Sequence, residues 1–173
     1  MARLPLQVLV IPFRRFADRR VEYAIFRRHD CTDNCWQGVA GGAEQGESAE
    51  QAARREMMEE AGIPVDAPLV PLDAVASVPA SQFQERALWG PDLYVVPERA
   101  FGVYLDENQT IRLSSEHTEH RWLPYEEAVR LLRWDSNRTA LWELNERLGR
   151  TSSYQTECWL SGHSLRARPP TCE

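Results

Sequence analysis

The length, composition and charge of this sequence exclude several classes of protein. Its 173 residues suffice for one continuous hydrophobic core but are few for two domains. A hydrophobic content of 43% and six tryptophans exclude a disordered chain, and a formal net charge of −6 gives no overall field that would hold a nucleic-acid duplex. A phosphate-bearing ligand would have to be bound by a local device such as a metal ion.

The sequence has no recognisable targeting or membrane-spanning segment. No run approaches the ~18 apolar residues of a membrane span. Residues 1–13 carry one arginine and are interrupted by Pro5 and Pro12, with no small-residue cleavage site after them. Four cysteines are too few for a disulfide framework in a chain of this length, so we expect Cys31 and Cys35 to be reduced thiols. These features predict a cytoplasmic protein.

The first half of the chain predicts strands that lead into one well-defined helix. Strands are expected at residues 7–13, 21–28 and, more briefly, 36–40. A glycine-rich loop is expected at residues 41–47, and a helix at residues 49–61. Ser48 and Gln51 have the spacing of a capping box at the start of the helix. Gly62 is typical of a helix end. This helix is the clearest local prediction in the sequence.

The second half predicts more strands and two further helices. Strands are expected at residues 69–78 and 99–105, an extended stretch ends at residue 123, and helices are expected at residues 124–132 and 136–148. Gly149 is expected to end the last helix. The connection at residues 79–97 is long and carries Phe83, Trp89 and Tyr94, and loops of this length are often functional.

One segment of the sequence carries a specific motif. Residues 41–63 read GGAEQGESAEQAARREMMEEAGI, which resembles the Nudix box, G-x5-E-x7-R-E-U-x-E-E-x-G-U with U a bulky aliphatic residue. All nine specified positions are filled without a gap, by Gly41, Glu47, Arg55, Glu56, Met57, Glu59, Glu60, Gly62 and Ile63. Few short motifs are this specific, so the chain is identified as resembling the Nudix hydrolase family.

The charges of this helix indicate a bound cation independently of the motif. At about 100° per residue, Glu56 and Glu60 lie roughly 40° apart on the helix surface, and Glu59 lies roughly 60° from Glu56. Like charges at these spacings cost about 0.2–0.5 kcal/mol per pair, and Glu59 and Glu60 also oppose the negative end of the helix dipole. A divalent cation reverses these effects. Hard oxygen ligands suit Mg²⁺ or Mn²⁺.

The resemblance to the family implies roles for the other residues of the site. The arginine at the position of Arg55 pairs with the glutamate at the position of Glu47 and holds the loop that contains Gly41 onto the helix. Outside the box, LSSEHTEHRWL at residues 113–123 resembles the family pattern that supplies one more carboxylate, here Glu116. The metal ligands are therefore expected to be Glu56, Glu59, Glu60 and Glu116. Catalytic proton transfer is expected from Glu59, Glu56 or Glu116.

Substrate contacts are expected from residues around this cleft. Arg27 and Arg28 end a predicted strand, and alternation along a strand sends only one of them to each face. Of the two, we favour Arg27 as a phosphate contact. Trp36 and Phe83 are aromatic candidates for contact with the substrate ring system. Residues 134–140 resemble the start of the last helix in the branch of the family that contains dATP and dihydroneopterin triphosphate pyrophosphatases.

Together these features predict the fold and the activity. The resemblance implies an α/β Nudix fold, an α/β/α sandwich with a central mixed sheet, in one domain at residues 1–150 followed by a loosely ordered tail at residues 151–173. The implied activity is Mg²⁺- or Mn²⁺-dependent hydrolysis of a small-molecule nucleoside triphosphate or dihydroneopterin triphosphate, by a monomer or homodimer. Diadenosine polyphosphates and ADP-ribose are alternative substrates, and a non-catalytic nucleotide-sensing regulator is the alternative of another class.

Overall fold

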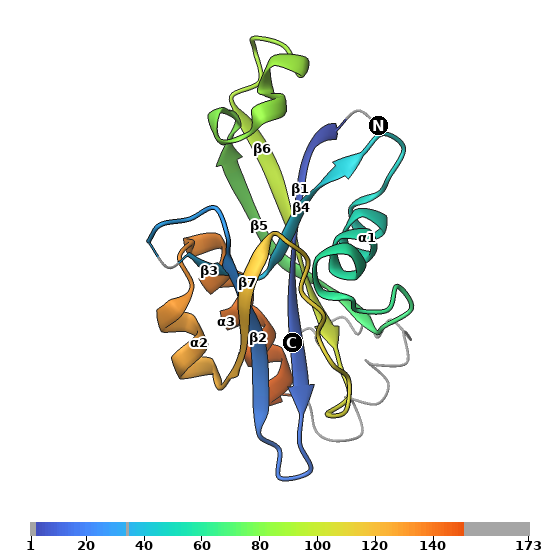
Figure 1. The fold of residues 1–173 in the computed structure, drawn as a ribbon, viewed down its shortest axis with the longest axis vertical. Coiled ribbons are helices and arrows are strands. Elements are labelled where there is room, and N and C mark those ends of the chain that lie inside the picture. Colours follow the sequence, from blue (N-terminus) through green and yellow to red (C-terminus); the bar gives the residue numbers. More distant parts are fainter. Residues whose placement is uncertain (1–2, 34, 151–173) are drawn as a thin grey trace, which may run out of the picture.

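A mixed sheet of seven strands lies at the centre of the computed structural model, which describes residues 3–33 and 35–150 (Figure 1). The strands are β1 (Arg3–Arg15), β2 (Val21–Arg28), β3 (Trp36–Gln37), β4 (Val39–Glu44), β5 (Leu69–Pro79), β6 (Val95–Tyr104) and β7 (His117–Leu123). Strands β1 and β6 pair in parallel, and the other named pairs are antiparallel. The predicted mixed sheet is confirmed.

Strand β1 is buried on both faces because helices cover both sides of the sheet. Side chains alternate between the two faces of a strand, so Val8 and Val10 pack in one core cluster while Leu9 and Ile11 pack in the other. All four are at most 2% exposed. A strand covered on both faces reads as a continuous apolar run, which is how residues 8–11 appear in the sequence.

Three helices complete the sandwich: α1 (Ala49–Ala61), α2 (Tyr125–Leu131) and α3 (Asp135–Arg150). Helix α1 buries Met57 and its alanines in the core cluster of Val8 and Val10. Helix α3 buries Leu141 and Leu144 in the cluster on the opposite face. Figure 1 shows α1 and α3 on the two sides of the sheet. This arrangement confirms the predicted α/β/α sandwich.

The structure differs from the sequence-based elements in several places, the first being β1, which was predicted at residues 7–13 and runs from Arg3 to Arg15. Residues 41–44, predicted as loop, belong to β4 because they pair with β1. Helix α3 does not end at Gly149 but continues to Arg150. The long connection is shorter than predicted, since β5 runs to Pro79 and β6 starts at Val95.

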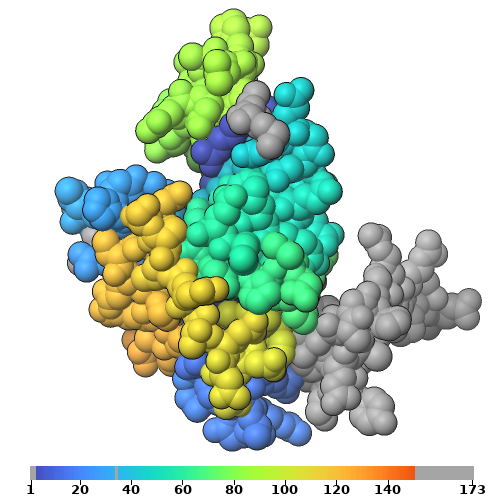
Figure 2. Space-filling model, turned by 45° about the vertical axis from the view of Figure 1, so that its right-hand side comes forward, coloured from blue at the N-terminus to red at the C-terminus, as the bar shows by residue number. Residues whose placement is uncertain are grey.

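Between these two strands lies a segment that we call the arm, residues 80–94. It contains two short 3-10 helices, Ala80–Gln82 and Gln84–Leu88. The arm projects beyond the body of the molecule, at the top of Figure 2, where it is green. The edge-to-face contact of Phe83 and Trp89, with ring centroids 5.5 Å apart, stabilises it from within.

The sheet opens where the candidate site lies. Strand β4 pairs with residues 3–10 of β1, whereas β2 pairs with residues 13–15 of β1. Strands β4 and β2 thus follow one another along the edge of β1 that β6 does not occupy, and β3 and β7 pair with β2. Side chains from the ends of β2, β4 and α1 can therefore meet in one place.

The predicted tail and the expected absence of a membrane-spanning segment are treated differently by the structure. The predicted tail, residues 151–173, lies outside the described residues, so the proposed domain boundary at residue 150 stays a prediction. None of the helices in the described ranges has both the length and the apolar character needed to cross a membrane.

Candidate active site

A pocket of about 530 Å³ lies at the opening of the sheet. Helix α1 contributes Glu56, Glu59 and Glu60, and the turn before β7 contributes Glu116. The four glutamates that the sequence predicts as metal ligands thus line one cavity. The remaining lining residues are Arg3, Gln7, Arg28, Ala40, Gly41, Gly42, Glu44, Arg55, Gln82, Phe83, Gln84 and Glu85.

Local sequence signals set the ends of the helix that carries three of these glutamates. The Ser48 side chain accepts a hydrogen bond from the backbone N–H of Gln51, and the Gln51 side chain accepts one from the Ser48 N–H. This capping box satisfies two N–H groups that the first turn leaves unpaired. At the other end, Gly62 adopts the left-handed conformation with φ of 65°. The predicted helix is confirmed from Ala49 to Ala61.

The Arg55 guanidinium ties the helix to the preceding loop. Its Nε and Nη2 donate to the two carboxylate oxygens of Glu47 at 2.8 and 2.9 Å, a bidentate arrangement. The Nη2 group also donates to the Gly42 carbonyl at 2.9 Å, and Nη1 donates to Glu56 and Glu59 at 2.9 and 3.1 Å. The contact expected between Arg55 and Glu47 is therefore present. The same guanidinium neutralises part of the negative charge of the row formed by Glu56, Glu59 and Glu60, which we call the acidic ridge.

Gly41 makes room for the Glu56 carboxylate. A Cβ atom built on Gly41 would lie far closer to the Glu56 carboxyl atoms than the 3.0 Å limit that real Cβ atoms respect. The glycine is therefore required by close approach rather than by a turn, because residue 41 lies within β4. Burial raises the pKa of Glu56, and the hydrogen bond from Arg55 opposes that effect.

Glu60 has the most perturbed carboxyl group in the pocket. Its side chain is 4% exposed, and Oε2 has no hydrogen-bond partner among the described residues. Burial, together with the charges of Glu56 and Glu116, raises its pKa to about 8. The His117 Nε2 atom lies 3.8 Å from this oxygen, and burial lowers the pKa of His117 to about 4, so the imidazole is neutral at pH 7.

Glu116 and Arg28 line the pocket from outside the motif. Glu116 is exposed, its carbonyl accepts a hydrogen bond from the His29 N–H at 2.8 Å, and its own N–H donates to the Ser114 hydroxyl at 3.2 Å. Arg28 donates to both carboxylate oxygens of Asp30, at 2.7 and 2.5 Å. A glutamate and an arginine outside the box are therefore held by backbone and side-chain bonds beside Glu60.

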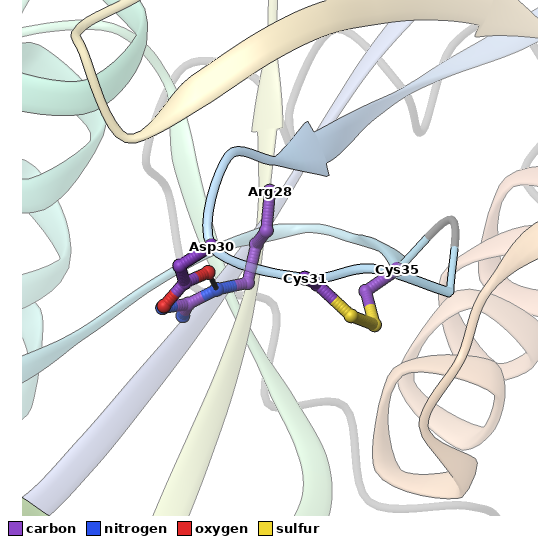
Figure 3. Close-up of a disulfide and its surroundings, with 4 residues drawn as sticks. All are labelled: Arg28, Asp30, Cys31 and Cys35. Atoms are coloured by element: carbon purple, nitrogen blue, oxygen red, sulfur yellow. Dashed lines mark hydrogen bonds and ion pairs between the residues drawn. A yellow bond between two sulfur atoms is a disulfide. The ribbon is translucent and has the colours of Figure 1, made fainter.

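The structure joins Cys31 and Cys35 in a disulfide in the connection between β2 and β3, beside the Arg28–Asp30 pair (Figure 3). The prediction of reduced thiols is therefore wrong for these two residues. Counting cysteines along the sequence missed the pairing, because the turn brings the two Cα atoms to 5.8 Å from one another, within bridging distance. Disulfides are rare in the cytosol, so this bridge does not support the predicted cytoplasmic location. That location stays a prediction.

Only one of the three predicted substrate-binding residues lines the pocket that contains the four glutamates. Phe83 lines the pocket from the arm, but Arg27 and Trp36 are not among the lining residues. Arg27 lies 3.8 Å from Glu119 on β7, and Trp36 is 4% exposed with the Arg121 guanidinium 4.7 Å from its ring centroid. Alternation places Arg27 and Arg28 on opposite faces of β2, and it is Arg28 that lines the pocket, so the phosphate contact expected of Arg27 stays a prediction.

Arg3 and Gln7 of β1 line the pocket but were not identified from the sequence as site residues. The Gln7 Oε1 atom is buried and has no partner among the described residues. The signal in the sequence was weak, because a single polar residue at the start of an apolar strand is common. Only the pairing of β1 with β4 places these residues beside the glycine-rich segment.

The donor chemistry of the pocket fits a hard divalent cation. Four carboxylates supply oxygen ligands, and the buried Oε2 of Glu60 has no hydrogen-bond partner among the described residues. In the described part of the chain, no three carboxylate, thiol or imidazole side chains already surround one point as metal ligands do. Glu56 and Glu59 are instead hydrogen-bonded to Arg55.

Comparison with known proteins agrees with this geometry. Residues 4–143 match the model of the NUDIX domain, which is most of the chain. This chain belongs to the Nudix family. It is 32% identical over 139 residues to dihydroneopterin triphosphate diphosphatase of Escherichia coli, covering 79% of this chain and 89% of that protein. The chain is accordingly a Nudix hydrolase that acts on phosphorus-containing acid anhydrides.

Solved structures of Nudix proteins share its fold. A Nudix hydrolase of Listeria monocytogenes, described as putative, is 43% identical with a TM-score of 0.75, covering 84% of this chain and 95% of that one. The E. coli dihydroneopterin triphosphate pyrophosphohydrolase is 28% identical with a TM-score of 0.68, covering 84% and 99%. The predicted family and fold are therefore confirmed.

Proposed function

We propose that this Nudix hydrolase uses Mg²⁺, or Mn²⁺ in its place, to cleave a nucleoside triphosphate or dihydroneopterin triphosphate into a monophosphate and pyrophosphate. The observation that carries the proposal is the convergence of Glu56, Glu59, Glu60 and Glu116 on one pocket, with a buried oxygen of Glu60 left unpartnered. The E. coli relative that is named for dihydroneopterin triphosphate supports the substrate class.

In this proposal all four glutamates bind the cation, and the two exposed ones can also accept a proton. Glu56 and Glu60, which are 8% and 3% exposed, would hold the metal together with Glu59 and Glu116. A divalent cation there would neutralise phosphate charge and lower the pKa of a bound water. Glu59 and Glu116 are exposed, so either can accept the proton that the attacking water loses.

The bond changes balance without a covalent enzyme intermediate. The water oxygen forms a bond to phosphorus, and the anhydride P–O bond breaks with its electron pair on the leaving oxygen. Attack at the α-phosphorus makes pyrophosphate the leaving group, and attack at the β-phosphorus makes the monophosphate the leaving group; both give the same two products. Arg28, held in place by Asp30, supplies positive charge on the Glu116 side of the pocket and can bind phosphate oxygens.

A substrate panel tests this function. Purified protein is incubated with dATP, dGTP, dihydroneopterin triphosphate, diadenosine tetraphosphate and ADP-ribose, with Mg²⁺ or with EDTA, and the products are separated by chromatography. We expect Mg²⁺-dependent release of pyrophosphate, fastest from one of the triphosphates. Preference for the diadenosine compound or ADP-ribose would replace the proposed substrate class, and no turnover of any substrate would favour a nucleotide-sensing regulator.

A variant tests the metal site separately. Glu60→Gln keeps the size of the side chain but removes the charge, so we expect turnover of the preferred substrate to fall by two orders of magnitude or more. Near-normal turnover in this variant would remove Glu60 from the proposed metal ligands. Circular dichroism of the variant serves as the control for folding.

A further inference from the structure

Arg3, the first described residue of β1, lies in the pocket against the glycine-rich strand β4. It lines the same cavity as Glu56. A Cβ atom on Gly42 would collide with the Arg3 Nε atom, well inside the 3.0 Å limit for real Cβ atoms. The side chain therefore rests directly on bare backbone. Gly41 and Gly42 make room for opposite charges, Gly41 for a carboxylate and Gly42 for a guanidinium.

Arg3 acts electrostatically on the acidic ridge. Burial raises the pKa of Glu56, and the positive charge of Arg3 is among the influences that lower it. On the opposite side of the pocket, the charge of Arg28 has the corresponding influence on Glu60. Two cations therefore flank the row of glutamates, one from β4's side and one from the end of β2. A polyphosphate chain lying along the ridge would meet a cation at each end.

The backbone of Arg3 is firmly held, whereas its charge is not. The Trp89 Nε1 group donates to the Arg3 carbonyl at 2.7 Å. The guanidinium, by contrast, meets Glu85 through one Nη1–Oε1 contact of 3.4 Å, and the two side chains are 34% and 30% exposed. A long, partly exposed ion pair is worth little, so another anion can replace it. Both contacts come from the arm.

The other two arginines that line the pocket are committed to internal partners. Arg55 makes hydrogen bonds to Glu47, Glu56, Glu59 and the Gly42 carbonyl. Arg28 makes two short bonds to Asp30. Within the described lining of the pocket, Arg3 is thus the arginine with the weakest internal anion.

We propose that Arg3 binds a phosphate group of the substrate, and that Glu85 of the arm is the internal anion which this phosphate replaces. The inference rests on the proposed function only in taking a polyphosphate as the ligand. It assigns Arg3 as a substrate-binding residue and Glu85 as a residue that tunes affinity through Arg3.

The first test is equilibrium binding of inorganic tripolyphosphate, measured by calorimetry in Ca²⁺. The Arg3→Gln variant is compared with Arg86→Gln, which removes the same charge from an exposed position of the arm outside the pocket lining. We expect Arg3→Gln to weaken binding roughly tenfold to a hundredfold, and Arg86→Gln to change it less than about twofold. Because no hydrolysis is needed, the test stands even if the substrate panel shows no turnover.

Glu85→Gln tests the displaced anion with an effect of opposite sign. Removing the competing carboxylate should tighten tripolyphosphate binding roughly two- to fivefold. The same substitution made on the Arg3→Gln background should have no effect, because its influence passes through the guanidinium. Arg3→Lys, which keeps the charge, should recover part of the lost affinity.

Two results would overturn the proposal. One is unchanged tripolyphosphate binding in Arg3→Gln, and the other is weaker binding in Glu85→Gln. Thermal unfolding of each variant controls for folding. If Arg3→Gln does not fold, the Glu85→Gln and Arg3→Lys variants still decide the question, since both keep a cation at residue 3. With an active enzyme, Arg3→Gln should raise KM for the triphosphate far more than it lowers kcat.

Discussion

The raised pKa of Glu60 makes a specific prediction about the stability of the metal-free protein. A carboxyl group with a pKa of about 8 in the folded state and 4.5 in the unfolded state stabilises the fold only while it is protonated. Its contribution is therefore fully present below pH 4.5 and is lost as the pH rises through 8. Glu60→Gln mimics the protonated group, so the variant should be more stable than the wild type at high pH.

The size of the effect follows from the two pKa values. One pKa unit corresponds to about 1.36 kcal/mol, so a shift from 4.5 to about 8 is worth on the order of 5 kcal/mol once the pH exceeds 8. At pH 7 the expected difference is roughly 3 kcal/mol.

Urea unfolding in EDTA at pH 5 and pH 8 measures this difference. His117 opposes the trend below pH 6.5, because burial lowers its pKa to about 4 and its neutral form is lost as the pH falls. The difference between the wild type and Glu60→Gln, rather than either curve alone, therefore isolates Glu60. Glu59→Gln is the matched control, because Glu59 is exposed and its substitution should change stability by no more than about 0.5 kcal/mol.

Adding Mg²⁺ should reverse the order of the two proteins at pH 8. A cation that binds only the folded state stabilises it, and Glu60→Gln would lack one of its anionic ligands. The reasoning would be refuted if Glu60→Gln were less stable than the wild type at pH 8 in EDTA. An equal difference at pH 5 and pH 8 would also refute it, because the effect would then not come from ionisation.

Other substitutions probe the packing around the site. Gly41→Ala should lower kcat by a factor of about 100 without loss of helical circular dichroism, because its Cβ would displace the Glu56 carboxylate by roughly 1 Å; unchanged kcat would contradict this. Asn137→Ala should lower the free energy of unfolding by about 1–3 kcal/mol in urea titrations, because the buried Asn137 Oδ1 accepts a backbone N–H at 2.8 Å, whereas no loss would mean that another acceptor takes its place. Replacing both Cys31 and Cys35 by serine should lower it by about 2 kcal/mol, the entropy of closing a short loop, and equal stability of the oxidised protein and the variant would argue against the bridge.

The sequence by itself determined the elements whose signals are local. Helix α1 has its start signal in Ser48 and Gln51 and its end signal in Gly62, so its boundaries can be derived without any tertiary contact. Strand β2 was similarly predictable from its β-forming residues. The three glutamates Glu56, Glu59 and Glu60 could be grouped from helix periodicity and the motif, because they share one side of one helix. For these features, cause and effect lie within a few residues of each other.

Only the tertiary structure decided the features that depend on distant partners. Residues 41–44 became a strand because β1 lies beside them, and that pairing also places Arg3 in the pocket. The packing of the end of β2 places Arg28, and not Arg27, in the pocket lining. Strand pairing and register are set by contacts between segments far apart in sequence, and such contacts leave no local periodicity from which they could be predicted.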